Sequence, residues 1–359
     1  MPSKAEPIDG IHVLRAVAAI MVVAHHARHS VPGSENWPLF GSSGVDIFFV
    51  ISGYVMALTT QGSITTGQFL IKRFVRIVPL YWLATLYTSR RGPFSLDLLK
   101  DALFIPRLND NWPGWIAPHL QQGWTLNCEM MFYLIFAIAM LVGRWRYFTI
   151  LAVLGLMPLL SSLPGVAAEF YGNSIVWEFG FGILLFRFLG KFPHWPRSAY
   201  LGLVAVGFLL LALLYDQSPR PLTQGLPALL IVWASFKACK GWLKCQPLIL
   251  LGDASFAIYL FHWASFGAMK PIARVIQNPD LLMVGHILTG IVAGVIIHLA
   301  VEKPVTRLVS SWLGLRRVPA ALPPEESPDT TQLHRGLPEI AIATGDPQHK
   351  DRVDPHVTD

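Results

Sequence analysis

The chain has 359 residues, of which 53% are hydrophobic and only 14% are charged. Because a soluble domain carries roughly 25% charged residues, this composition excludes an ordinary soluble protein and predicts an integral membrane protein. The formal net charge is +6, and membrane topology explains this excess better than a nucleic-acid partner does. The three cysteines are too few for a disulfide framework, and their spacing does not predict a metal site.

Hydropathy predicts an all-α, polytopic membrane protein with about ten transmembrane helices. Each apolar segment is close to the length of about 17–25 residues that a helix needs to cross the hydrocarbon core. The predicted segments are 10–31, 41–60, 69–88, 124–143, 147–164, 171–190, 199–216, 221–237, 248–270 and 281–301.

The distribution of Lys and Arg over the loops predicts that both termini are cytoplasmic. Loops on that side carry roughly twice as many of these residues as the outer loops. Residues 1–9 are expected to form a cytoplasmic lead, 10–318 the membrane domain, and 319–359 a disordered cytoplasmic tail rich in Pro, Glu and Asp. The first segment contains Arg15 and lacks a small-residue cleavage site, so we expect no cleavable signal peptide.

The first apolar segment contains two ionisable residues, Arg15 and His26. Such groups are costly inside a bilayer and are therefore candidates for a functional site. The two residues are eleven positions apart, which is about three helical turns, so they are predicted to share one helix face.

Four ionisable residues are predicted at a similar depth near the outer surface of the membrane, taking ~1.5 Å of rise per residue. They are His26, Asp46, Glu129 and His262, each in a different apolar segment. A carboxylate beside an imidazole fixes its tautomer and stabilises the imidazolium, as general-base catalysis requires. We therefore expect a catalytic site at this depth, with His26 as its base.

A second, basic cluster is predicted on the cytoplasmic side, where Lys72, Arg73 and Arg76 begin the third segment. Arg73 and Arg76 are three residues apart and project from one helix face, and paired guanidiniums suit phosphate groups. The alternative is a positive-inside anchor. Arg15 is predicted at a depth where it extends this cluster inward, and Glu302 is a candidate ion-pair partner. An acyl-CoA, with its phosphates and long thioester arm, has the shape to bridge the two clusters.

The longest predicted outer loop, 89–123, contains Trp112 and Trp115 among Asn and Asp residues. Such residues can stack on a sugar and hydrogen-bond to it. The alternative is an interfacial aromatic belt, which we favour for this loop.

Six sequence blocks in order resemble the acyltransferase-3 family of membrane proteins, particularly the exopolysaccharide and O-antigen O-acetyltransferases. The resemblance covers about 8–308. The blocks are Arg15 to His26, 44–54, the pair Arg73 and Arg76, 124–129, 251–262 and 302–304. Asn127 and Cys128 stand where the family often has Ser-Val, and we expect no esterase-like domain after the membrane part.

The resemblance implies ten core helices and transfer of an acyl group, usually acetyl, from cytoplasmic acyl-CoA to a carbohydrate hydroxyl. It implies that His26 is the catalytic histidine, that Arg15 is its motif partner, and that Arg73 and Arg76 line the acyl-CoA site. His26 would act either as a general base or as an acyl acceptor. Acceptor binding would then rest on the membrane domain, its outer loops or another protein.

The sequence thus predicts an O-acetyltransferase of the bacterial inner membrane, with acetyl-CoA as donor and no metal. The predicted acceptor is a surface polysaccharide or its lipid-linked precursor, and polysaccharide-assembly proteins are candidate partners. Two alternatives remain open. One is transfer of succinyl or another acyl group to a different acceptor. The other is a proton-coupled transporter, since intramembrane ionisable residues also mark proton paths.

Overall fold

The computed structural model describes residues 8–62, 64–89, 95–191, 195–239 and 245–314. The predicted tail, 319–359, and most of the predicted lead lie outside these ranges. Within them the protein is all-α, as predicted, and has one isolated antiparallel bridge, between Leu108 and Ile116.

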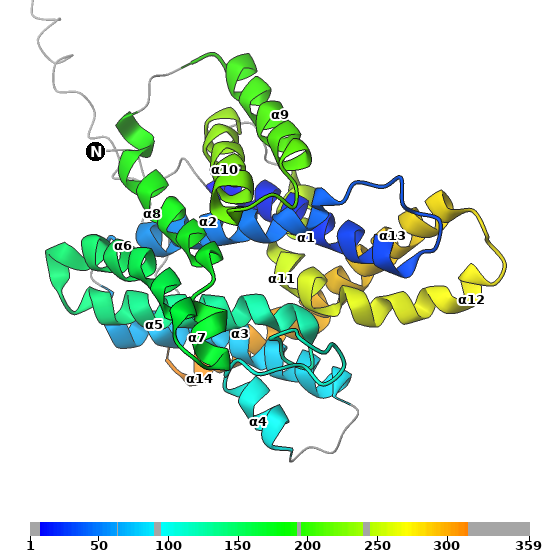
Figure 1. Ribbon diagram of the computed structural model, residues 1–359, viewed down its shortest axis with the longest axis horizontal. Coiled ribbons are helices and arrows are strands. Elements are labelled where there is room, and N and C mark those ends of the chain that lie inside the picture. Colours follow the sequence, from blue (N-terminus) through cyan, green and yellow to red (C-terminus); the bar gives the residue numbers. More distant parts are fainter. Residues whose placement is uncertain (1–7, 63, 90–94, 192–194, 240–244, 315–359) are drawn as a thin grey trace, which may run out of the picture. The chain divides into compact units, whose positions relative to one another are not determined.

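Fourteen α-helices follow one another within the described ranges (Figure 1). They are α1 (Ile8–Ser30), α2 (Gly44–Thr59), α3 (Thr66–Thr88), α4 (Leu96–Ala102), α5 (Trp124–Met140), α6 (Arg146–Leu156), α7 (Val166–Tyr171), α8 (Trp177–Phe188), α9 (Arg197–Leu213), α10 (Leu226–Ala238), α11 (Gln246–Phe266), α12 (Lys270–Ala273), α13 (Pro279–Ile297) and α14 (Lys303–Trp312).

Six helical segments in the described part of the chain are long and apolar enough to cross a membrane. They are Gly10–Ser30, Phe40–Thr59, Gln121–Met140, Gly143–Ser162, Gln246–Ala273 and Pro279–Trp312, and each overlaps a predicted span. The other four predicted spans overlap α3, α8, α9 and α10. Helix α3 carries a basic cluster, and the other three helices have 12, 17 and 13 residues. The predicted count of ten spans is therefore not confirmed.

Helix α11 packs along both α1 and α13, while α2 packs along α8 and also contacts α1 and α10 (Figure 1). Glycines bring α2 and α8 together: a Cβ atom on Gly53 would overlap the backbone of Phe179, and one on Gly182 would overlap the backbone of Val50. Small residues that allow such close approach are typical of helix contacts in membranes. This contact fixes the position of α2, which lines the site described below.

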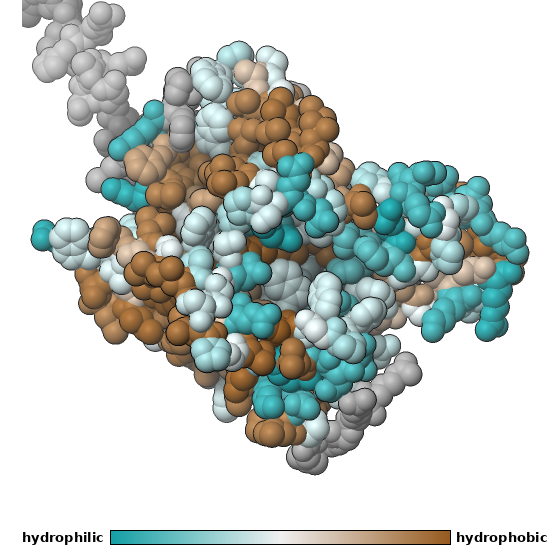
Figure 2. Space-filling model, in the orientation of Figure 1, coloured by the Kyte–Doolittle hydropathy of each residue, from teal (hydrophilic) through white to brown (hydrophobic). Residues whose placement is uncertain are grey.

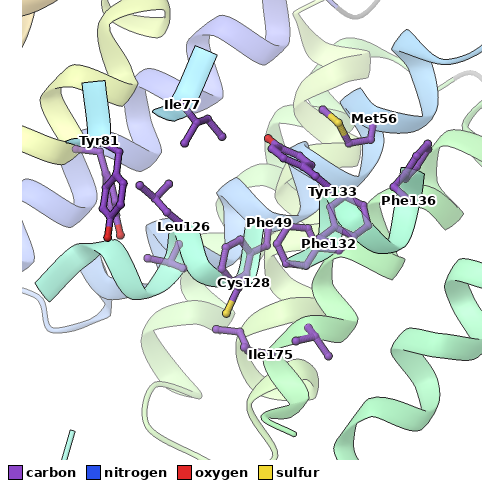
Figure 3. Packing of buried hydrophobic residues seen from close by; sticks show 14 of the residues in the cluster. Phe49, Met56, Ile77, Tyr81, Leu126, Cys128, Phe132, Tyr133, Phe136 and Ile175 are labelled. Atoms are coloured by element: carbon purple, nitrogen blue, oxygen red, sulfur yellow. The ribbon is translucent and has the colours of Figure 1, made fainter. Parts of the chain in front are cut away.

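Aromatic side chains fill the space between α2, α3, α5 and α8 (Figure 3). Phe179 stacks on Phe49 and on Phe132, with ring centroids 4.4 and 4.3 Å apart. Leu126 and Tyr133 belong to the same buried cluster and also line the cavity described below. The cluster therefore forms a close-packed wall on one side of the cavity.

Helix α3 begins with a capping box: the Thr65 side chain accepts a hydrogen bond from the Gln68 backbone, and the Gln68 side chain accepts one from the Thr65 backbone. Pro79 lies inside the helix and cannot donate a backbone hydrogen bond. The capping box therefore fixes where the helix that carries Arg73 and Arg76 begins.

Apolar side chains cover much of the outer surface of the helices. Figure 2 shows them gathered over α9 and over the side formed by α5 and α6. Leu209 and Leu213 on α9 and Phe148 on α6 are all more than half exposed. Contiguous apolar surface of this kind is rare on soluble monomers. It fits helices that face lipid.

Candidate active site

A cavity lies between α1, α2, α3, α5 and α11. Its charged residues are Arg15 from α1, Arg73 and Arg76 from α3, and Glu129 from α5. Three guanidiniums against one carboxylate make the lining positive. The cavity is therefore suited to an anionic ligand.

Arg15 faces this cavity from α1. Its Nε donates a hydrogen bond to Ser255 Oγ over 3.1 Å, and Ser255 donates to the Gly252 carbonyl over 2.7 Å. Arg15 thus lies with the arginines of α3, which agrees with the prediction that it extends the basic cluster.

Arg73 is buried among aromatic rings. Its guanidinium lies 5.6 Å from the Phe69 ring centroid and 6.0 Å from that of Tyr133, and its Nη2 donates to Thr59 Oγ1 over 3.2 Å. Its Nε has no hydrogen-bond partner among the described residues. A buried donor without an acceptor is costly, and an anionic group in the cavity could satisfy it. Lys72, by contrast, is exposed and does not line the cavity.

Glu129 belongs to the cavity as well. Its Oε1 accepts hydrogen bonds from Ser52 Oγ, over 3.1 Å, and from the Tyr133 hydroxyl. Its hydrogen-bond partners are therefore cavity residues rather than His26. The expected pairing of this carboxylate with the histidine is not what the structure shows.

His26 and His262 form a direct pair. His26 Nδ1 and His262 Nε2 are 2.9 Å apart, and the rings stack with centroids 4.9 Å apart. His262 Nδ1 lies 3.2 Å from the Ile258 carbonyl, which can only accept, so this nitrogen carries the hydrogen. In the neutral pair His262 Nε2 then accepts from His26 Nδ1–H. This assignment, made from the hydrogen-bond network, leaves a lone pair on His26 Nε2.

Asp46 lies in a different buried cluster. Arg220 holds its carboxylate with two hydrogen bonds, of 3.0 and 2.7 Å. The fully buried Glu178 lies against the same carboxylate. Asp46 therefore has Arg220 and Glu178 as partners instead of the expected histidine. Neither partner was predicted from the sequence, although Glu178 is an ionisable residue inside the predicted span 171–190 and is a candidate on that ground.

Glu302 pairs with His298 Nδ1 over 2.8 Å rather than with an arginine. It lines a second, mostly apolar groove that shares Arg76 with the first cavity. The expected ion pair between Glu302 and the basic cluster is therefore not formed.

A buried carboxylate orders the segment 95–123, which the sequence predicts to belong to an outer loop. Asp101 accepts from Arg107 Nε over 2.8 Å and lies 2.8 Å from His119 Nδ1. Burial lowers the pKa of Arg107, but the hydrogen bond and charge of Asp101 outweigh it and raise this pKa above its ordinary value. The loop displays Trp112 and Trp115, each more than half exposed. These indoles are available either to a sugar or to the membrane interface.

The sequence matches the family described as "Acyltransferase domain" over residues 8–302. The chain belongs to this family, acyltransferase-3, and is a membrane acyltransferase. It is 31% identical over 301 residues to the exopolysaccharide production protein ExoZ of Rhizobium meliloti, covering 78% of this chain and 94% of that protein.

Two further relatives are more distant. The peptidoglycan O-acetyltransferase OatA of Listeria monocytogenes is 28% identical over 75% of this chain, and the match spans half of OatA. The putative membrane-bound transacylase BcsY of Komagataeibacter xylinus is 26% identical, over 82% of this chain and 81% of BcsY. No solved structure matches the chain.

Proposed function

We propose that this protein is an O-acetyltransferase of the bacterial cytoplasmic membrane, with both termini in the cytoplasm. It moves an acetyl group from cytoplasmic acetyl-CoA to a hydroxyl of a surface polysaccharide or its lipid-linked precursor. The convergence of Arg15, Arg73 and Arg76 on one cavity, beside a histidine pair, carries the proposal. The names of the relatives support it, since one acts in exopolysaccharide production and another is named as an O-acetyltransferase.

The arginine-lined part of the cavity binds the phosphates of the donor. Guanidiniums bind phosphate oxygens through paired, charge-assisted hydrogen bonds. Arg73 offers an unused Nε for this purpose. Lys72 adds positive charge at the exposed surface of α3 and attracts the anionic donor from a distance.

His26 carries the chemistry through its free Nε2. As a base, it takes the proton of the acceptor hydroxyl while the oxygen attacks the thioester carbon, the C–S bond breaks, and the thiolate of CoA gains a proton. As a nucleophile, Nε2 attacks the thioester carbon, and the C–S bond breaks to release the thiolate of CoA. The acceptor oxygen then attacks the acyl carbon, the C–N bond breaks, and the hydroxyl proton passes to the freed Nε2. His262 serves both routes because it holds the Nδ1–H tautomer of His26.

Asp46 and Glu129 act as positioning residues. Asp46 fixes the first turn of α2 through Arg220. Glu129 orients Ser52 and Tyr133 along the cavity, where it also balances part of the positive charge.

Replacing His26 by Phe tests this function. We expect a loss of transfer of about 10²–10⁴-fold, the usual contribution of acid–base catalysis, measured as radiolabel passing from acetyl-CoA to glycan in proteoliposomes. His29→Phe is the matched control, because His29 is an exposed residue of the same helix. Normal transfer by a correctly inserted His26→Phe protein would disprove the proposal. Proton-coupled flux without acyl transfer would support the transporter alternative.

A further inference from the structure

The cavity changes in chemical character along α2. Near the end of α2 its lining includes Met56 and Arg73, and Arg73 bonds to Thr59 in the last turn of α2. Near the start of α2 it is lined by Val45, Phe48 and Tyr259. From Val45 to Met56 is about 16 Å at ~1.5 Å per residue. The cavity thus has a charged end and, well separated from it, an aromatic end, defined here as Val45, Phe48 and Tyr259.

Tyr259 is held in place at the aromatic end. Its hydroxyl lies 2.8 Å from Thr125 Oγ1 and donates to the Gln122 carbonyl over 3.0 Å. Phe48 packs edge-on against its ring, with centroids 6.0 Å apart. The ring is almost fully buried, so it has little freedom to move aside.

The histidine pair lies just beyond this aromatic end. His262 is three residues after Tyr259 on α11, and the two ring centroids are 6.4 Å apart. Neither His26 nor His262 lines the cavity itself. Tyr259 therefore lies both at the aromatic end of the cavity and next to the histidine pair, so the reactive end of a donor must come close to it.

We propose that Phe48 and Tyr259 set the size of the acyl group, so that the aromatic end accepts acetyl and excludes longer chains. The inference rests on the proposed function, with the phosphates of the donor at the arginines and its thioester at the aromatic end. A close-packed wall leaves little space for additional methylenes. The same apolar surface disfavours a succinyl group, because its carboxylate would be buried without a partner.

The test compares acetyl-CoA, butanoyl-CoA and succinyl-CoA as donors, using the full chain in proteoliposomes. For the unaltered protein we expect kcat/KM to be highest with acetyl-CoA. Phe48→Ala should raise the ratio of kcat/KM for butanoyl-CoA to that for acetyl-CoA at least about tenfold, which is typical for discrimination of small apolar groups. Succinyl-CoA should remain poor in both proteins.

Two further variants keep the test decisive. Phe148→Ala removes an exposed phenylalanine of α6 and should leave the ratio unchanged. If Phe48→Ala does not fold, Phe48→Leu opens the same end by a smaller volume and should shift the ratio in the same direction.

The outcomes separate the two proposals. If the unaltered, folded protein transfers no acyl group from any of the three donors, the proposed function fails. Only the inference on acyl size is overturned if the unaltered protein uses butanoyl-CoA as well as acetyl-CoA. The same holds if it transfers acetyl but the folded Phe48 variants keep its ratio of kcat/KM for butanoyl-CoA to that for acetyl-CoA.

Discussion

At the residue scale, the histidine pair fixes which ring nitrogen of His26 carries the hydrogen. The Ile258 carbonyl determines the tautomer of His262, and His262 in turn determines that of His26. Two hydrogen bonds thus leave His26 Nε2 free to accept a proton or an acyl group. The neutral imidazole of His262 thus fixes the tautomer of His26, a role that a carboxylate has in many other histidine sites.

His262 is therefore expected to act through His26. His262→Leu should lower kcat by about 10–100-fold, the range found when a group that orients a metal-binding histidine is removed, with KM for acetyl-CoA little changed. His262→Gln should recover part of the lost activity, since its amide oxygen can accept from His26 Nδ1–H. Equal losses in the two variants, or a rise in KM alone, would contradict this role.

The arginines of α3 are expected to govern donor binding. Arg73→Ala should raise KM for acetyl-CoA about tenfold or more, because it removes a buried, charge-assisted donor from the cavity. Lys72→Ala should cause a smaller rise that disappears at high ionic strength, because Lys72 is exposed and acts at a distance. Unchanged donor affinity in Arg73→Ala, measured by steady-state kinetics and direct binding, would reject the proposed donor site.

At the element scale, the contact between α2 and α8 depends on two glycines. Gly182→Ala should lower the free energy of unfolding by about 1–3 kcal/mol, the usual cost of overpacking, since its Cβ would overlap the backbone of Val50. Gly202→Ala in α9 is the matched control: no heavy atom lies within 4 Å of its Cβ position. There we expect a gain of about 0.5–1 kcal/mol.

Thermal unfolding in detergent measures both changes. A Gly182→Ala protein as stable as the unaltered chain would show that α8 can move away from α2 at little cost. Activity assays on the same samples would then show whether the cavity tolerates that movement.

The helices themselves were largely predictable, because apolar periodicity and segment length are local properties of the sequence. All ten predicted spans contain a helix, although only six are long and apolar enough to count as spans. Distance along a helix was also readable from residue number, and the structure brings Arg15 to the same cavity as Arg73 and Arg76. The contacts between helices could not be predicted, because the position of a residue along its own helix does not determine which other helices pack beside it.

The site shows this limit most clearly. His26, Asp46, Glu129 and His262 were predicted at one depth, yet only the two histidines contact each other. Asp46 instead contacts Arg220, which lies 174 residues away in the chain. Tertiary packing alone decides such pairings, so no spacing in the sequence could have revealed them.

At the scale of the whole molecule, the fold separates the arginine-lined end of the cavity from the histidine pair. Helices α1 and α11 pack together, and Arg15 bonds to Ser255 in the first half of α11 while His26 bonds to His262 near its end. The segment that follows the exposed tryptophans reaches this second end, because Gln122 donates to the Leu260 carbonyl. The proposed reaction therefore requires the start of α11 to face the cytoplasm.

Chemical labelling of Cys245 tests that requirement, since this residue directly precedes α11 and is exposed. In a Cys239→Ser background, a membrane-impermeant maleimide should label Cys245 in inverted vesicles and leave it unlabelled in spheroplasts. The matched control adds Asn111→Cys beside the exposed tryptophans and removes Cys245, and its labelling should show the opposite pattern. Cys128 is buried and should stay unlabelled in both. Labelling of Cys245 from outside would place the arginine-lined end away from cytoplasmic acyl-CoA, and the proposed direction of transfer would then be wrong.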